Sequence, residues 1–112
     1  MSKNKVPAPR HLRPETAKWF RSVCAEYVLE AHHVRLLRLA AEAWDRCEKA
    51  REVLDREGVS YRDRFDCPRA RPEVAIERDS RIAFSRLIRE LDLDTSLTPD
   101  PSRPPAISSN RR

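Results

Sequence analysis

Glycine and proline are scarce in the middle of this 112-residue chain, and that scarcity constrains its fold more than any other feature. Between residues 14 and 94 the only glycine is Gly58, and the prolines are Pro14, Pro68 and Pro72. Because glycine and proline are the residues that interrupt helices, the segments between them can form long helices. We therefore expect an all-α fold of three amphipathic helices. Their expected ranges are about 14–30, 33–57 and 72–91.

The first expected helix begins at Pro14, which suits a first helical turn because its missing N–H would lack a partner there anyway. Beyond it, apolar side chains recur at spacings of three and four residues, as on one face of a helix. They are Trp19, Phe20, Val23, Cys24, Tyr27, Val28 and Ala31. The polar residues His32 and His33 are expected to mark a tight corner before the second helix.

The second expected helix closes at Gly58, because glycine readily adopts the left-handed conformation that follows a helix C-terminus. Its apolar residues cover an arc of roughly 160° on a helical wheel, which is wider than one neighbouring helix needs. A second packing partner is therefore expected. Acidic and basic residues also alternate at i,i+4 spacing, which we interpret as ion pairs on a solvated face. These pairs are Glu42 with Arg46, Asp45 with Lys49, and Glu52 with Arg56.

Arg51 lies near the middle of the same apolar arc, where a charged side chain needs a partner or a route to water. One interpretation is that its side chain extends past the apolar face to solvent and pairs with Glu48 or Asp55. The other interpretation is an ion pair across a contact between subunits.

The stretch VSYRDRFDCPRARP follows Gly58 and alternates apolar with polar residues around a turn-forming centre. It fits either a loop or a short hairpin over residues 59–71. The third helix then opens with Arg-Pro-Glu, as the first helix does. Its apolar residues gather on one side, and its arginines lie within about 140° on the other, where they form either a solvated or a DNA-contacting surface. These arginines are Arg78, Arg81, Arg86 and Arg89.

The formal net charge of +5 is concentrated at the two ends of the chain. Residues 1–13 carry four basic residues and no acidic one, residues 95–112 have a net charge of +2, and residues 14–94 have −1. Both end segments have a composition that cannot bury enough apolar area to become ordered. We expect a flexible basic arm at 1–13, a helical oligomerisation and DNA-recognition domain at 14–94, and a disordered Pro/Ser-rich tail at 95–112. Basic arms favour a nucleic-acid partner, because lysine and arginine displace the counterions of phosphates.

Common catalytic and metal sites are missing from the sequence. A single glycine cannot provide a phosphate-binding loop of the form GxxxxGK[ST] or GxGxxG. The histidines His11, His32 and His33 have no nucleophile and orienting acid at recognisable spacing, and adjacent histidines point about 100° apart on a helix. The cysteines have no CxxC spacing, so neither a disulfide framework nor a zinc site is indicated. We expect no enzyme activity, no metal and no cofactor.

The chain also gives no sign of a membrane association. No stretch approaches the run of about 20 apolar residues that a membrane span requires. The basic opening MSKNKVPAPRHLR lacks the apolar region of a secretory signal. We therefore expect a soluble cytoplasmic protein.

Two stretches, HHVRLLRLAAEAWDRCEKAREVLDREG and DRFDCPRARPEVAIERDSRIAFSRLIRELDLD, carry a set of landmarks in a fixed order. The landmarks are Leu37, Ala40, Asp45, Arg46, Ala50, Arg51, Leu54, Gly58, Pro72, Arg81, Phe84, Leu87, Glu90, Leu91 and Leu93. In their order and separation, about residues 14–94 resemble the small terminase subunits of tailed bacteriophages, the P27-like family. The chain departs from that family at Asp66 in the turn and at Asp92 in the last helix ending, where such proteins often carry glycine.

The resemblance implies a non-catalytic, ring-forming subunit that binds phage DNA near the packaging start site. Such a subunit presents the DNA to the large terminase subunit, which supplies the ATPase motor and the nuclease. The implied partners are double-stranded phage DNA, the large terminase subunit and further copies of the chain. The implied location is the cytoplasm of the infected or lysogenic bacterial host. Two alternatives stay open, a helical protein–protein adaptor and a small DNA-binding transcriptional regulator.

Two groups of residues are candidates for this function. The candidates for DNA binding are Lys3, Lys5, Arg10, Arg13, Arg78, Arg81, Arg86 and Arg89. The candidates for the core or an oligomer face are Trp19, Phe20, Leu37, Trp44, Arg51, Leu54, Phe84 and Leu87.

Overall fold

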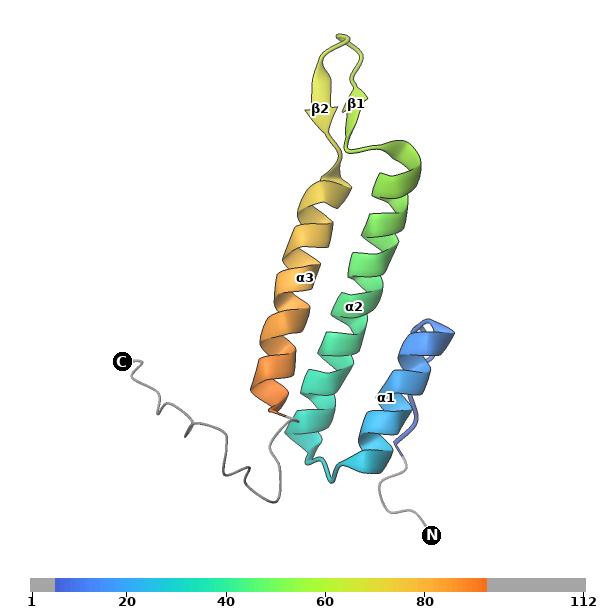
Figure 1. Cartoon of the computed structure of the whole chain (residues 1–112), viewed down its shortest axis with the longest axis vertical. Coiled ribbons are helices and arrows are strands. Elements are labelled where there is room, and N and C mark those ends of the chain that lie inside the picture. The colour runs from blue at the N-terminus through green and yellow to red at the C-terminus, as the bar shows by residue number, and fades with distance from the viewer. Residues whose placement is uncertain (1–5, 93–112) are drawn as a thin grey trace, which may run out of the picture.

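The computed structural model describes residues 6–92, so Lys3, Lys5 and the predicted tail at 95–112 lie outside the described residues. It is mostly helical, as predicted, with a small two-stranded sheet (Figure 1). The elements in chain order are α1 (Pro14–Glu26), α2 (Ala31–Glu57), β1 (Ser60–Arg62), β2 (Pro68–Ala70) and α3 (Pro72–Leu91).

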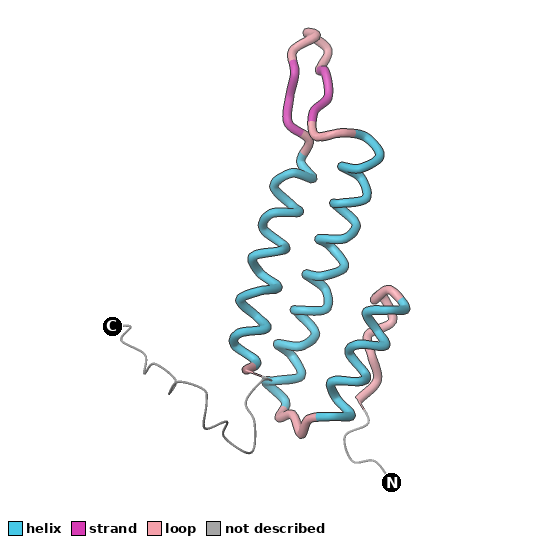
Figure 2. The backbone as a smooth tube through the Cα atoms, in the orientation of Figure 1, coloured by secondary structure: helices cyan, strands magenta, loops and turns pink. Residues whose placement is uncertain are grey.

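The longest helix, α2, lies between the other two helices. α3 runs back along α2 after the hairpin β1–β2, which projects beyond one end of the helix pair (Figure 1). α1 packs along the half of α2 that is farther from the hairpin (Figure 2), and its Trp19 also contacts Phe84 of α3. No helix within residues 6–92 is long and apolar enough to cross a membrane.

The first helix is shorter than predicted. It ends at Glu26 rather than near residue 30, because the backbone of Tyr27 turns extended, with φ −119° and ψ 149°. The prediction that Val28 belongs to the apolar face of this helix is wrong, since Val28 lies in the connection and is 84% exposed. The corner therefore precedes the two histidines instead of containing them.

A reciprocal cap explains why α2 begins at Ala31 and not at residue 33. The side chain of Glu30 accepts a hydrogen bond from the backbone N–H of His33, and the His33 ring accepts one from the backbone N–H of Glu30. This is a capping box, in which two otherwise unpaired N–H groups of a helix start are satisfied. Histidine in place of the usual glutamate or glutamine hid the signal in the sequence.

The third helix has the predicted bounds, and the segment before it is the hairpin rather than the loop. Its strands pair antiparallel, with Tyr61 opposite Arg69. Asp66 has φ 60°, in the left-handed region. The backbone N–H of Asp66 donates to the Asp63 carbonyl at 2.9 Å, and that of Asp63 donates to the Cys67 carbonyl at 3.1 Å. This is a tight turn followed by a left-handed residue, a common way to close a short hairpin.

The core lies where α1, the start of α2 and the end of α3 meet. Its fully buried large side chains are Phe20 and Leu37. On α2 the buried residues include several alanines, which allow a close approach of the neighbouring helices. They are Ala40, Ala41, Ala43 and Ala50. The wide apolar arc of α2 thus has two partners within the chain, α1 and α3, and its width alone requires no second subunit.

Candidate nucleic-acid and self-association surfaces

The segment 6–13 packs on the helices, which corrects the prediction of a flexible arm as far as residue 13. Leu12 is 7% exposed and belongs to the core, and Val6 and Ala8 pack against that core. The Arg13 guanidinium donates two hydrogen bonds to Glu52 on α2, at 2.9 and 3.1 Å. Arg13 therefore serves to attach this segment, whereas Arg10 is exposed.

An acidic face on α2 holds this segment and the start of α1. Asp45 accepts hydrogen bonds from the Arg13 backbone N–H at 2.9 Å and from the Thr16 hydroxyl at 2.5 Å. Glu42 accepts a hydrogen bond from the His11 ring at 2.7 Å. A carboxylate at the start of α1 also complements the positive end of the helix dipole.

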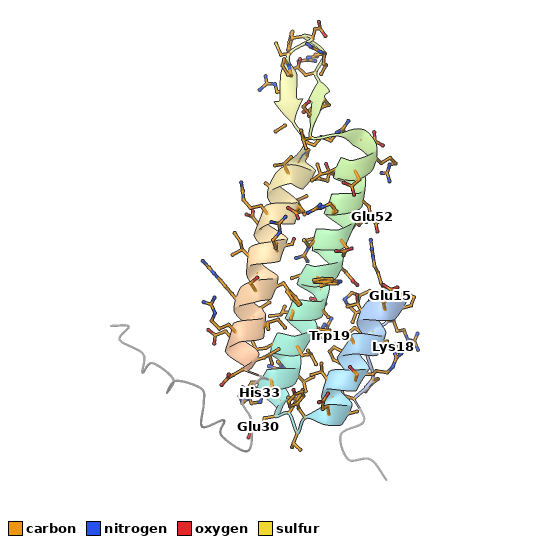
Figure 3. The ribbon with its side chains drawn as sticks, in the orientation of Figure 1. Glu15, Lys18, Trp19, Glu30, His33 and Glu52 are labelled. Carbon is orange, nitrogen blue, oxygen red and sulfur yellow. The ribbon has the colours of Figure 1, made fainter. Side chains whose placement is uncertain are left out.

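The predicted partners of these acids were wrong. Glu42 pairs with Arg38 at 3.1 Å instead of Arg46, and Glu52 pairs with Arg13 instead of Arg56. Figure 3 shows Glu52 on α2, beyond the end of α1 that is nearer the hairpin. The reason is that residues 11–16 fold onto this face, so Glu42 gains His11 and Glu52 gains Arg13 as partners, while Glu52 stays exposed.

Arg51 also has a partner that neither interpretation foresaw. Its guanidinium contacts Glu77 of α3 at 3.3 Å within the same chain. Glu77 is 8% exposed and also accepts a hydrogen bond from Arg81. The Cys47 thiol lies 3.6 Å from the Glu77 carbonyl oxygen and donates to it. The hydrogen bond from Arg81, followed by that from Arg51, lowers the pKa of Glu77, so this carboxylate is a charged link between α2 and α3.

The four arginines of α3 fall into two groups, those with an acidic partner in the described part of the chain and those without one. Arg78 pairs with Asp79 at 3.1 Å, and Arg81 is held by Glu77. Arg86 and Arg89 are exposed, and neither forms an ion pair within residues 6–92. Arg86 and Arg89 are therefore the part of this candidate surface that is available to phosphates.

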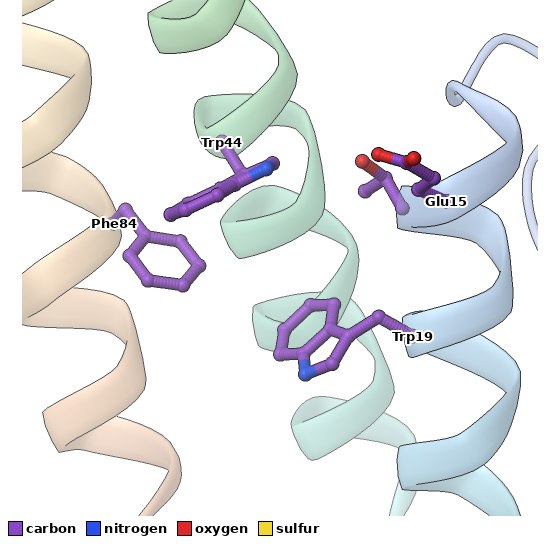
Figure 4. Close-up of a pocket in the computed structure, with 5 residues that line it drawn as sticks. Glu15, Trp19, Trp44 and Phe84 are labelled. Atoms are coloured by element: carbon purple, nitrogen blue, oxygen red, sulfur yellow. The ribbon is translucent and has the colours of Figure 1, made fainter.

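Three aromatic side chains, one from each helix, meet beside a hollow of about 310 Å³. The ring of Phe84 lies 5.1 Å from that of Trp44 and 6.1 Å from that of Trp19, between centroids (Figure 4). Glu15 and Thr16 complete the lining. Trp44 is 44% exposed, so this contact leaves an aromatic face open to solvent.

The eight candidate core or oligomer-face residues differ in burial. Phe20 and Leu37 are buried, and Trp44 and Arg51 are exposed. The half-buried ones are Trp19, Leu54, Phe84 and Leu87.

Further apolar side chains on the helix pair remain uncovered. Leu39 of α2 is exposed, as are Ile76 and Ile82 of α3. Ile82 lines a shallow hollow together with Leu87 and Arg86. Ile76 lines a separate hollow with Ala50 and Val53 of α2. Apolar side chains of α3 thus lie beside Arg86, which forms no ion pair within residues 6–92. We call the residues Ile82 and Leu87 the α3 strip.

The hairpin carries basic residues that the sequence reasoning did not select. Residues 59–71 contain four arginines and two aspartates, a net charge of +2. The arginines are Arg62, Arg64, Arg69 and Arg71. The signal is present in VSYRDRFDCPRARP, where arginines alternate with Tyr61 and Phe65, although Asp63 and Asp66 dilute the positive charge.

One group within residues 6–92 has the geometry to hold a metal ion. Ligand atoms of Glu30, His32 and His33 lie within 4.8 Å of one another. Adjacent residues on a helix point about 100° apart, which predicted separated histidine rings. The ring centroids are nevertheless only 4.1 Å apart. The capping box accounts for the position of Glu30 and His33, so these contacts have a structural role without any ion.

Comparison with known proteins gives no match to a family model, to a curated protein or to a solved structure.

Proposed function

We propose that the chain is a non-catalytic, DNA-binding small terminase subunit. In this proposal several copies assemble into a ring, bind phage DNA and hand it to the large terminase subunit for packaging in the bacterial host. The proposal rests on the family resemblance, on two special backbone positions and on the distribution of apolar and charged residues over the helices.

The main support for the proposal is the backbone conformation of Asp66 and Asp92, where the chain departs from the resembled family. Asp66 has φ 60° and Asp92 has φ 53°, and within residues 6–92 they are the only residues other than glycine with positive φ. These are the two positions where the resembled family often carries glycine. Glycine adopts the left-handed region without a steric penalty, whereas aspartate is among the few other residues that tolerate it. The departures thus keep the backbone geometry that glycine would favour, which supports the resemblance.

Self-association is supported by the α3 strip together with Leu39 and Trp44. These side chains are apolar and remain accessible after the helices have packed. Burial of apolar surface stabilises by about 25 cal/mol per Å², so a partner that covers the strip gains free energy. A second copy is the partner that a ring requires.

DNA binding is supported by the net charge of +5 and by Arg86 and Arg89, which lie exposed beside or near the strip. One chain offers few phosphate contacts. In a ring the same contacts repeat around an axis, so weak contacts to one duplex add up to avid binding.

Two measurements on the full chain test this function. Native mass spectrometry at micromolar concentration should show a closed oligomer for the wild type and a monomer for Ile82→Asp. The aspartate would place a charge on the surface that a second copy is expected to cover. Ala31→Asp, which places the same charge at an exposed position in the first turn of α2, is the control and should leave the oligomer intact.

DNA affinity is then measured against salt concentration for the wild type and for the double variant Arg86→Ala, Arg89→Ala. The slope of log K against log salt should become shallower by about 0.9 for every phosphate contact removed. A wild type that is solely monomeric, or that does not bind duplex DNA at low salt, contradicts the proposed function.

A further inference from the structure

The hairpin projects from the helix pair, and its strands take no part in the core. Every residue of β1 and β2 is exposed, and the two strands pair only with each other. The hairpin extends beyond the end of α2 and α3 and away from α1 (Figure 1). An isolated two-stranded hairpin is only marginally stable in water, so its order needs a local cause.

Asp63 supplies that cause. Its Oδ1 accepts hydrogen bonds from the backbone N–H groups of Phe65 at 2.8 Å and Cys67 at 3.0 Å. Its Oδ2 accepts a third from Arg69 at 2.9 Å. These donors lower the pKa of Asp63, the Cys67 N–H most of all, and the turn is thereby fixed around a charged carboxylate. An ordered turn backbone presents its outer side chains with a smaller loss of backbone entropy on binding.

The outer side chains of the turn are Arg64 and Phe65. Phe65 is 69% exposed, and the Arg64 guanidinium lies 5.1 Å from the centre of its ring. The other three arginines of the hairpin have acidic neighbours, whereas Arg64 forms no ion pair within residues 6–92. The tip therefore presents an unpaired positive charge directly beside an exposed aromatic face.

We propose that the hairpin tip is a DNA-contacting element, with Arg64 at a phosphate and Phe65 against the bases or sugars of a groove. This inference rests on the proposed function and adds a contact surface at the opposite end of α3 from Arg89. Two-stranded β-ribbons enter DNA grooves, and apolar wedges next to arginines are used by proteins that bind the minor groove. Because the subunits of a closed ring are related by rotation about its axis, the tips lie on one circle around that axis.

Replacing Arg64 and replacing Phe65 should affect binding to a fluorescent duplex of about 30 base pairs in different ways. Arg64→Ala should make the slope of log K against log salt shallower by about one unit for each tip in contact. Phe65→Ala removes no charge, so it should weaken binding by roughly fivefold to a hundredfold at every salt concentration and leave the slope unchanged.

Matched controls lie at the other end of the helices. Arg35→Ala removes an exposed arginine from the first turns of α2, and Val28→Ala removes an exposed apolar side chain from the α1–α2 connection. Neither should alter affinity or slope. Circular dichroism and native mass spectrometry of each variant verify that fold and oligomer are retained.

The outcomes separate the inference from the function on which it rests. If the wild type binds DNA and both tip variants match it in affinity and slope, the tip serves another partner, such as a protein, and the inference is wrong while the function stands. If the wild type fails to bind DNA at low salt, both are overturned.

Discussion

Asp45→Ala should detach the start of α1 from α2. The change removes the acceptor of two hydrogen bonds, one from the Arg13 backbone N–H and one from the hydroxyl of Thr16, which is 5% exposed. A hydrogen bond to a charged group contributes about 1.5–3 kcal/mol, and a buried donor left without a partner costs a similar amount. Because both bonds share one carboxylate, their losses do not add fully. We expect the free energy of unfolding to fall by about 2–4 kcal/mol.

Thermal unfolding followed by circular dichroism at a fixed protein concentration measures this effect. For a domain of this size, each kcal/mol shifts Tm by about 4–8 °C, so a fall of roughly 10–25 °C is expected. Asp45→Asn keeps an acceptor oxygen for one of the two donors, so its Tm should lie between those of the wild type and the alanine variant.

The matched control is Asp55→Ala, which removes an exposed aspartate from the same helix. It should change stability by no more than about 0.5 kcal/mol. An Asp45→Ala variant as stable as Asp55→Ala would refute the reasoning, because the attachment of α1 would then depend on its apolar face alone.

Three further predictions concern single residues. Since two arginines lower the pKa of Glu77, this group stabilises the fold above its ordinary pKa, and the contribution is lost as pH falls through the lower value of the folded state. Glu77→Gln should therefore flatten the loss of Tm with acidification below about pH 4.3, and an identical acid limb for variant and wild type would speak against a charged link. Asp66→Gly should raise the free energy of unfolding by about 0.5–1 kcal/mol, measured by urea titration, because glycine relieves a left-handed aspartate; a clear loss of stability would count against this account. Cys67 is exposed, whereas Cys24 is buried and its pKa is raised by burial, so Ellman's reagent should label Cys67 quickly and Cys24 only in denaturant. Rapid labelling of Cys24 in the native protein would contradict its place in the core.

The helical framework was accessible from the sequence because its boundaries depend on local chemistry. Pro14, Gly58 and Pro72 mark three helix ends, and each has the predicted place in the structure. The end of α1 was missed because neither glycine nor proline stands there. The backbone turns extended at Tyr27, and the next helix begins at the cap formed by Glu30 with His33, a role for histidine that has no recognised sequence pattern.

The candidate surfaces were less accessible, because they depend on contacts between distant residues. Helical spacing correctly placed Glu52 and Arg51 on their faces, but it could only assign partners from the same helix. Their actual partners, Arg13 and Glu77, lie 39 and 26 residues away. In the same way, spacing grouped four arginines on α3, whereas folding gives acidic partners to two of them.

The central position of α2 makes its length a constraint shared by both neighbours. One residue inserted near Cys47 would rotate the following part of the helix by about 100°. The contact of Glu52 with Arg13 and the contact of Arg51 with Glu77 would then be lost together. No adjustment of a single neighbouring helix could restore both contacts. Extra residues between Arg62 and Pro68 would disturb neither helix contact. Length differences among homologous chains are therefore expected to accumulate at the tip, while α2 retains its helical phase.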